Sequence, residues 1–315
     1  MQTTNHILMV RPVRFAFNEE TAANNAFQQR SETEEAAQAI AREAIEEFDA
    51  FVRLLCENGI TVEVVQDTPE PFTPDSIFPN NCFSVHGDTL VLYPMFAPNR
   101  RLERKKICGL PLERGSSDAL KASPNGGRFE GGSLLDLTHY EESGRFLEGT
   151  GSLVLDREHG VAYACLSPRT DEEVLKEWAS AMGYSYLTFH SQDGQGMPVY
   201  HTNVMMHVGS RQAVVCLESI PNPSEREALK AMLEQYGKEV VPITLAQMNQ
   251  FAGNMLELHN DRGEQLLVMS QTARRSLTTT QIATLSKHTR ILSPDIHAIE
   301  AAGGGSARCM MAEIF

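Results

Sequence analysis

Apolar and polar positions along this chain form a unit that recurs. Each unit begins with an apolar strand, passes through a turn into an amphipathic helix, and ends in a second apolar strand. The first unit starts at His6–Pro12 and closes at Ile60–Val65, and its helix is expected to stop at Asn58 and Gly59. This alternation of strands and helices predicts an α/β fold.

The unit returns several times in the rest of the chain. Three later copies are clear, and they cover Gly160–Phe189, Gln212–Thr244 and Gln265–Pro294. The last two begin about fifty residues apart with no linker-like break between them, which indicates a repeat architecture. A weaker copy at Thr89–Gly109 gives a strand and a short helix but no readable closing strand.

Single residues mark the ends of two of the predicted helices. Thr170 and Asp171 are N-cap candidates for a helix that Gly183 ends, because their side-chain oxygens can accept from the first free N–H groups. Ser224 and Glu227 have the spacing of a capping box at the start of the next helix. We therefore expect helices over residues 171–183 and 224–237.

Five short segments between the units are predicted to be further strands, each beginning near glycines or polar residues. They are residues 79–85, 130–136, 200–208, 253–258 and 307–315. If each of the five copies contributes one such strand to a central axis, the pattern predicts a closed circular α/β array with the helices outside. This array is expected to be one domain over residues 1–315. An ordinary doubly wound sheet is the alternative. The polar stretch 18–35 is predicted to be a surface loop or lid.

Composition and charge narrow the classes of function. The chain has 315 residues, 42% of them hydrophobic and 22% charged, which is typical of a soluble globular protein with a large core. A formal net charge of −14 repels phosphate backbones and anionic membranes, so neither nucleic acid nor a membrane is an expected partner. Six cysteines stand singly, which favours neither a zinc site nor disulfides. We expect a cytoplasmic protein with reduced thiols.

Three side chains are candidates for chemistry. Cys309 follows three glycines near the end of the chain, His201 follows a glycine-rich loop, and Glu130 precedes a Gly-Gly pair. Each also has a structural interpretation, since cysteine is among the most buried residue types. His207 is interpreted as a core histidine and Asp75 as a turn residue beside proline. The sequence has no GxSxG, HExxH or phosphate-binding loop, which disfavours serine hydrolases, zinc proteases and nucleotide binding.

The motifs PNN, FEGG, HTN, GNMLEL and GGGSARCM occur in this order along the chain. Their order and the repeat resemble the guanidine-modifying (pentein) superfamily of arginine deiminases, dimethylargininases, amidinotransferases and succinylarginine dihydrolases, over nearly the whole chain. The resemblance implies a five-bladed α/β propeller that needs neither cofactor nor metal. It also implies that Cys309 is the nucleophile, His201 the histidine and Glu130 the carboxylate, and that Arg169 in LSPRT holds a substrate carboxylate.

This set of groups suits one type of reaction. A thiolate can add to the trigonal carbon of an amidino or ureido group, and an imidazole can protonate the departing amine and then activate water. A carboxylate matches the planar N–H donors of such a group. The expected partner is therefore a small amino-acid substrate, and a homodimer is the default assembly.

The sequence departs from arginine deiminases at two places. Their histidine motif H-x-D and an earlier strand motif carry aspartates that clamp the guanidinium, whereas this chain has Asn203 and the pair Asn80 and Asn81. Amides suit an uncharged ligand and supply both donors and acceptors, which matches a ureido group. The preferred substrate is therefore citrulline, hydrolysed to ornithine, ammonia and carbon dioxide.

Other functions stay open at the level of the sequence. An arginine deiminase, dimethylargininase, dihydrolase or amidinotransferase acting on a guanidinium is the alternative within the same class. The same propeller also occurs in a ribosome-binding initiation factor, so a non-catalytic binding protein is a second alternative. A papain-like protease or transglutaminase is less favoured, because its cysteine would precede its histidine and begin a helix.

Overall fold

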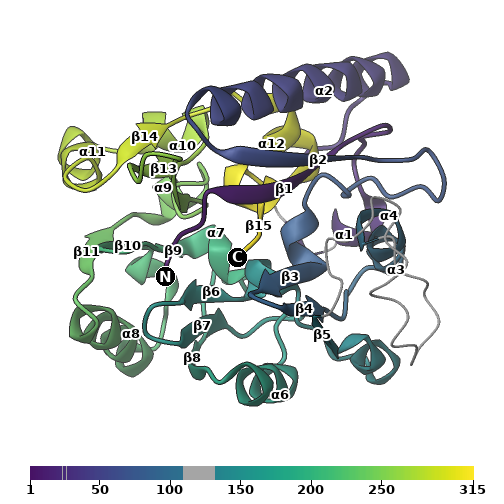
Figure 1. Cartoon of the computed structure of the whole chain (residues 1–315). Coiled ribbons are helices and arrows are strands. Elements are labelled where there is room, and N and C mark those ends of the chain that lie inside the picture. Colours follow the sequence, from purple (N-terminus) through teal and green to yellow (C-terminus); the bar gives the residue numbers. More distant parts are fainter. Residues whose placement is uncertain (23, 26, 109–131) are drawn as a thin grey trace.

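Five small sheets organise this computed structural model, which describes residues 1–22, 24–25, 27–108 and 132–315 (Figure 1). Each sheet has three strands, and its middle strand pairs antiparallel with one neighbour and parallel with the other. Each sheet is given as antiparallel partner, middle strand and parallel partner. The first sheet is β15 (Ala312–Glu313), β1 (His6–Arg11) and β2 (Thr61–Gln66), and the second is β3 (Phe83–His86), β4 (Thr89–Leu92) and β5 (Ser133–Asp136). The remaining three are β6 (Val154–Asp156), β7 (Val161–Cys165) and β8 (Ser185–Phe189); β9 (Met206–Val208), β10 (Gln212–Val215) and β11 (Glu239–Pro242); and β12 (Leu256–His259), β13 (Gln265–Val268) and β14 (Arg290–Leu292). The mixed α/β class predicted from the pattern is confirmed, whereas the doubly wound alternative is wrong for the described strands, because they form five separate sheets.

The helices that connect a middle strand to its parallel partner lie on the outside, whereas α7 lies near the centre (Figure 1). The longer helices are α2 (Glu34–Glu57), α6 (Glu172–Met182), α8 (Pro223–Gln235), α11 (Thr279–Leu285) and α12 (His297–Gly303). The shorter ones are α1 (Glu19–Ala22), α3 (Pro98–Arg101), α4 (Glu103–Cys108), α5 (Gly149–Ser152), α7 (Thr202–Met205), α9 (Leu245–Met248) and α10 (Gln271–Ser276). The 3-10 turns are η1 (Pro79–Asn81), η3 (Thr138–Ser143), η4 (Leu217–Ser219) and η5 (Ala307–Met310).

Three of the clusters of buried hydrophobic side chains lie between sheets and the outer helices α2, α6 and α8, and a fourth lies between the sheets of β1 and β4. In α2 the buried positions Ala44, Phe48, Phe51 and Leu55 recur every three or four residues, so one face of the helix packs against β1 and its neighbours. In α6 the face that carries Trp178 is buried in the same way. Each such large side chain contributes ~1.5–3 kcal/mol on burial. The hydrophobic pattern therefore fixes the distance of each helix from its sheet.

Most predicted helix ends are confirmed, and one is wrong. Asp171 is the N-cap of α6, and its side chain accepts from two backbone N–H groups, while Gly183 ends the helix at φ 70°. The predicted capping box at Ser224 is wrong. Asn222 is the N-cap of α8 and accepts from the N–H of Ser224, because Pro223 takes the first helical position.

The segment 130–136 was predicted to be one of the five strands between units, and this assignment is wrong. Its strand β5 pairs parallel with β4 and is the closing strand that the second unit lacked. The strand between the second and third units is β6 instead, which pairs antiparallel with β7 and follows the sequence LEGTGS at residues 147–152. The error arose because both segments have an acid and glycines before an apolar run.

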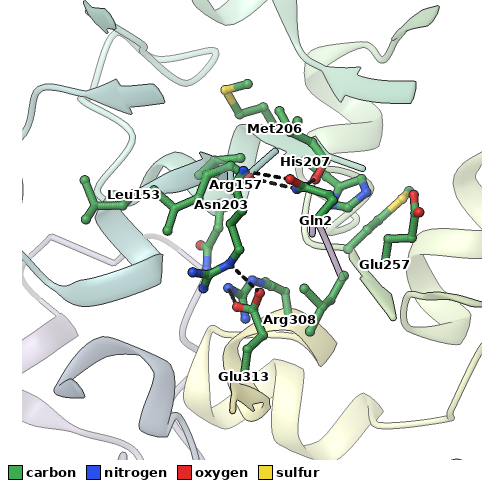
Figure 2. Close-up of a pocket in the computed structure, with 14 residues that line it drawn as sticks. Gln2, Leu153, Arg157, Asn203, Met206, His207, Glu257, Arg308 and Glu313 are labelled. Carbon is green, nitrogen blue, oxygen red and sulfur yellow. Dashed lines mark hydrogen bonds and ion pairs between the residues drawn. The ribbon is translucent and has the colours of Figure 1, made fainter. Parts of the chain in front are cut away.

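The antiparallel partner strands face the centre of the molecule, where they contact one another. β15 contacts β3, and β9 contacts both β6 and β12. On one side of this centre the ion pairs of Glu313 with Arg308 and Arg157 measure 2.5 and 3.4 Å, and the Gln2 side chain is held between Arg157 and Val208 (Figure 2). Burial opposes ionisation of Glu313, but the two arginines hold its pKa at about 2. None of the described helices is long and apolar enough to cross a bilayer.

Candidate active site

Cys309 lies in η5, directly after the glycine-rich loop, with 4% of its surface exposed. Its Sγ accepts hydrogen bonds from Nδ2 of Asn254 at 3.3 Å and from Nδ2 of Asn203 at 3.6 Å. Asn254 also accepts from the N–H of Arg308 and donates to the carbonyl of Asn203, each at 3.0 Å. Two amide groups are thus fixed beside the sulfur.

His201 is the N-cap residue of α7, so the prediction of a continuous strand over residues 200–208 is wrong. The short helix intervenes because the backbone turns between His201 and Met206, where β9 begins. His201 and His207 therefore do not share a strand face. His207 is 4% exposed, as expected for a core histidine.

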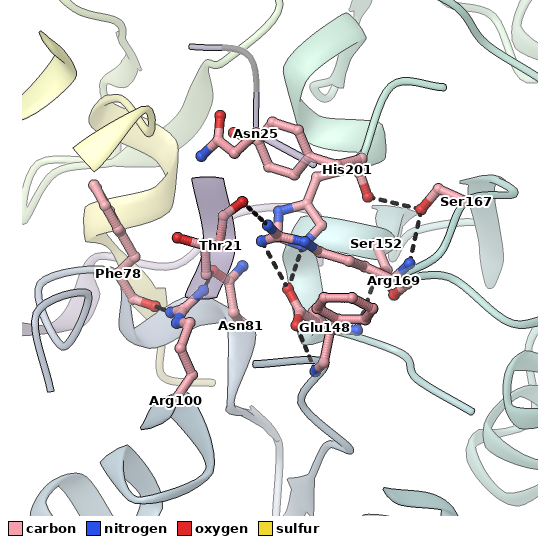
Figure 3. Close-up of polar contacts among 12 residues, drawn as sticks. Thr21, Asn25, Phe78, Asn81, Arg100, Glu148, Ser152, Ser167, Arg169 and His201 are labelled. Carbon is pink, nitrogen blue, oxygen red and sulfur yellow. Dashed lines mark hydrogen bonds and ion pairs between the residues drawn. The ribbon is translucent and has the colours of Figure 1, made fainter. Parts of the chain in front are cut away.

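The imidazole of His201 is oriented by Glu148. Its Nε2 lies 2.7 Å from Oε2 of Glu148, which is fully buried just before α5 (Figure 3). Burial opposes ionisation of Glu148, but Arg169 and His201 nevertheless hold its pKa at about 2. Burial lowers the pKa of His201 to about 4, against the opposing effect of Glu148. The imidazole is thus neutral at pH 7, donates from Nε2 and keeps the Nδ1 lone pair free to act as a base.

Gly151 sets how closely these groups approach one another. A Cβ at this position would lie 2.4 Å from Nδ2 of Asn81 and 2.7 Å from Nδ1 of His201. Only glycine leaves room for both groups beside the backbone of α5. The base and the amide donor are therefore held against the same short stretch of chain.

Cys309 and His201 border one cavity. Asp75, Asn81, Arg100 and Arg169 border it as well, together with Tyr200 and the three glycines 303–305. Its free space is about 20 Å³, enough for one water molecule. A thiol, an imidazole and fixed polar groups around one cavity can carry out nucleophilic catalysis on a small polar headgroup.

Asn81 presents a donor to this cavity. Its Oδ1 accepts from Nη1 of Arg100 at 2.8 Å, and because a guanidinium only donates, the amide oxygen must face Arg100. Its buried Nδ2 has no hydrogen-bond partner among the described residues. Arg100 is itself held by Glu103 at 2.9 Å. The lining of the cavity therefore includes an amide that is fixed in orientation and whose N–H group has no partner among the described residues.

Asp75 presents an acceptor to the same cavity. It is 3% exposed, and its Oδ2 accepts from the side chain of Asn18 at 2.7 Å. Its Oδ1 has no hydrogen-bond partner in the described part of the chain. Burial raises the pKa of Asp75, an effect that Arg100 partly offsets. The interpretation of Asp75 as an ordinary turn residue missed its position beside the cavity.

Described residues between Asn18 and Gln28 lie beside this cavity. Thr21 and Asn25 are buried at 1% and 5% exposure, and Asn25 borders the cavity. Arg169 donates to the carbonyl of Thr21 at 3.2 Å and also contacts Asn24 (Figure 3). The stretch predicted to be a surface loop or lid therefore includes buried residues and the short helix α1.

The residues predicted from the sequence fall into three groups. Cys309, His201, Asn203, Asn81 and Arg169 come together around the cavity or against the sulfur that borders it. The side chain of Asn80 points instead to Thr150, 3.3 Å away, and Asn80 does not border the cavity. Glu130 lies outside the described residues.

Sequence reasoning did not identify Glu148, Arg100 or Asn254 as site residues, and it interpreted Asp75 as a turn residue. One signal for Glu148 was present, because LEGTGS has the same acid-glycine pattern that singled out Glu130. Asn254 stands in the motif GNMLEL, but the sequence does not indicate its contact with the sulfur. No group of three or more His, Cys, Asp or Glu in the described ranges is arranged to hold a metal.

This fold and this cavity define a pentein-type enzyme that modifies guanidino groups. The family model for N,N dimethylarginine dimethylhydrolase, eukaryotic, matches residues 11–315, and the chain belongs to this family. It is therefore a hydrolase that acts on a carbon–nitrogen bond. No curated protein matches the chain significantly.

Solved structures share the fold at low sequence identity. The N-terminal domain of ArgZ, an arginine dihydrolase of the ornithine-ammonia cycle in cyanobacteria, matches with a TM-score of 0.72 and 14% identity over 97% of this chain and 96% of that one. AgrE in complex with L-arginine gives 0.71 and 16%, covering 98% of this chain and 40% of its own. A dimethylarginine dimethylaminohydrolase gives 0.63 and 16% over 99% of both chains.

Proposed function

We propose that this enzyme hydrolyses the ureido group of citrulline to ornithine, ammonia and carbon dioxide through a covalent intermediate on Cys309. The observation that carries the proposal is the free amide N–H group of Asn81 in the cavity that Cys309 and His201 border. A ureido group has a carbonyl oxygen that accepts this hydrogen bond, whereas a guanidinium has only donors. The substrate headgroup is thus a neutral one that carries both an acceptor and donors.

The roles of the other groups follow from the same geometry. Asp75 accepts from the ureido N–H groups through its free Oδ1, and Arg169 binds the carboxylate of the amino acid. Glu148 keeps His201 in the tautomer with a free Nδ1. The role expected of Glu130, a carboxylate that accepts from the planar N–H groups of the substrate, is here assigned to Asp75. Asn203 and Asn254 stabilise the sulfur anion.

The reaction then proceeds in two balanced steps. The sulfur of Cys309 adds to the ureido carbon, His201 passes the thiol proton to the leaving nitrogen, and ammonia departs, which leaves an S-carbamoyl group on the sulfur. His201 next activates a water molecule, whose oxygen bonds to the same carbon and releases the thiol. The resulting carbamate loses carbon dioxide and leaves ornithine. One water is consumed for each citrulline.

Substrate entry requires movement of the chain. A free space of about 20 Å³ holds one water molecule and not an amino acid. The chain at Thr21 and Asn24 has to move away, which breaks their contacts with Arg169. This movement frees the guanidinium of Arg169 for the substrate carboxylate, so the same arginine holds Thr21 and Asn24 when the site is empty and the ligand when it is filled.

We propose further that the five sheets close into a five-bladed propeller forming one catalytic domain over residues 1–315. The contacts of β15 with β3 and of β9 with β6 and β12 support this arrangement. Functional residues then come from successive blades and meet at the hub. The protein works in the cytoplasm, where its separate cysteines stay reduced.

Ammonia release from purified enzyme tests the substrate. Citrulline, arginine, dimethylarginine and succinylarginine are supplied in parallel, and ornithine is quantified with the ammonia. Citrulline is expected to be turned over best, with one ammonia for each ornithine. Turnover of arginine with none of citrulline would overturn the ureido assignment. A Cys309→Ala variant should release no ammonia from any of them.

A guanidino substrate is the second candidate, and one observation favours it. The free Oδ1 of Asp75 supplies a buried acceptor that suits a cationic guanidinium. Relatives in fold are named for arginine dihydrolysis and for dimethylarginine. An arginine dihydrolase would release two ammonia molecules for each ornithine, so the stoichiometry of the same assay separates the two reactions.

A further inference from the structure

A second cavity lies apart from the one that Cys309 borders. This groove has a volume of about 550 Å³, within the range of small-molecule sites. Its lining includes Phe27, Gln29, Asp193, Phe251 and Glu300. Among the described residues, the groove and the catalytic cavity have no lining residue in common.

Glu300 supplies an unused acceptor at the floor of the groove. It is 2% exposed, and its Oε1 accepts from the hydroxyl of Ser306 at 2.5 Å. Its Oε2 has no hydrogen-bond partner within the described residues. Burial raises the pKa of Glu300, partly offset by the nearby hydroxyls of Ser270, Ser306 and Thr272. A buried acceptor without a donor costs ~1–3 kcal/mol, which a bound donor would recover.

Phe251 provides an independent sign of a ligand site. It is a non-glycine residue at φ 60°, a conformation that costs free energy for a bulky side chain. Such residues cluster at ligand sites, where the surrounding structure holds them. The ring of Phe251 packs against that of Phe27 with centroids 5.2 Å apart. The pair presents aromatic surface to the groove beside the carboxylate.

The charge of the groove selects a cation. Asp193 and Glu300 are acidic, and no Lys or Arg is found among the described residues that line it. A carboxylate beside aromatic rings suits a cationic head with an apolar stem. The volume of about 550 Å³ is also large enough for an unbranched chain of several carbons.

We propose that this groove is a second ligand site, separate from the catalytic cavity, that binds a primary alkylammonium group. The ammonium donates to Oε2 of Glu300, and the alkyl stem lies against Phe27 and Phe251. Side chains of basic amino acids and linear diamines carry this chemistry.

Calorimetric titration of the full chain with n-pentylammonium chloride tests the site. This probe has neither a ureido group nor a carboxylate, so it does not depend on the catalytic groups. Saturable binding is expected, with 1-pentanol at least tenfold weaker because it lacks the charge. Absence of saturable binding would overturn the proposal.

Three variants locate the binding. Glu300→Gln keeps an oxygen for Ser306 but removes the charge, and it should weaken binding of the amine at least tenfold. Gln250→Lys places an ammonium in the groove from an exposed position and should do the same without touching the core. Glu227→Gln, an exposed charge on α8, is the matched control and should bind like the wild type. Equal affinity in all four proteins would contradict the site, whatever the result of the ammonia assay.

Discussion

At the scale of single residues, the hydrogen-bonding atoms that the protein leaves without a partner determine which substrate headgroup the site can bind. The side-chain oxygen of Asn81 accepts a hydrogen bond from Arg100, so only the N–H groups of this amide can bind a ligand. Glu148 accepts from the N–H of Phe96 through Oε1 and faces His201 with Oε2. Both side chains are therefore fixed in orientation by buried donors, and both act on the reaction through hydrogen bonds that cannot rotate away.

Asn81→Asp should lower kcat/KM for citrulline by ~10²–10³-fold, the typical loss for one fixed donor to a developing oxyanion. The carboxylate would face Arg100 with one oxygen and repel the ureido oxygen with the other. Steady-state ammonia assays measure the effect. Asn222→Asp, which keeps the N-cap of α8, is the control and should leave the rate unchanged. A variant as active as wild type on citrulline would remove Asn81 from the proposed site.

Glu148→Gln should lower kcat by ~10³-fold or more. The amide oxygen would turn to Phe96, so the NH₂ group would face His201 and force its Nε2 to accept, which moves the proton to Nδ1 and removes the base. Substrate binding should change less than turnover, which separate kcat and KM values reveal. Glu130→Gln is the comparison, and a loss there as large as that of Glu148→Gln would return the role of binding the substrate N–H groups to Glu130.

At the scale of elements, every unit contributes a site residue from the equivalent position, just before the strand that faces the centre. A short helical turn or loop precedes each strand that faces the centre, and it carries Asn81 before β3, Glu148 before β6, Asn203 before β9, Asn254 before β12 and Cys309 before β15. Short turns suit this task because each holds one side chain at a strand end with little freedom. The repeat thus builds a site from five positions that are equivalent in the units but different in residue type.

Gly151→Ala should impair catalysis through α5. Its Cβ would lie 2.4 Å from Nδ2 of Asn81, so one of the buried groups has to move. We expect a loss of kcat/KM of ~10²-fold, as for a misplaced catalytic group, and ~1–3 kcal/mol of stability, as for overpacking. Gly194→Ala has open space around its Cβ and should match wild type in both assays. Full activity of Gly151→Ala would show that the close approach is not needed.

At the scale of the whole molecule, buried histidines link stability to pH. Burial lowers the pKa of His207 to about 3, and those of His86 and His201 to about 3 and 4. Below pH 6.5 the unfolded chain binds protons at these side chains while the folded chain does not. Stability from this source is therefore complete above pH 6.5 and is lost as the pH falls. The carboxyl groups of Glu47 and Glu103, whose pKa values burial raises to about 7, act in the opposite direction.

His207→Gln should reduce the loss of stability on acidification. The free energy of unfolding of wild type should fall by ~2 kcal/mol more than that of the variant between pH 6.5 and 5, since each pKa unit corresponds to about 1.4 kcal/mol. The opposing carboxylates are common to both proteins and cancel in the difference. Denaturant unfolding at a series of pH values measures it. His139→Gln at the surface is the control, and parallel pH curves for His207→Gln and wild type would contradict the argument.

The sequence by itself determined the repeating unit, the outer helices and three of the residues that meet at the sulfur and the imidazole: Cys309, His201 and Asn203. The unit and the helices follow from periodicity, because local hydrophobic patterns dictate which faces are buried. The three residues follow from the resemblance of short motifs to the guanidine-modifying superfamily. The departure from aspartate to asparagine was also readable, and it directed attention to a neutral headgroup.

Only the tertiary structure decided which acid meets His201 and which amide atoms stay free. Glu148 and His201 are 53 residues apart, and Asn254 and Cys309 are 55 apart, so no local pattern relates them. Strand 133–136 belongs to its unit only through parallel pairing with β4, which the sequence does not display. Contacts of this kind depend on how the sheets pack around the centre, and packing is a property of the folded chain and not of any one segment.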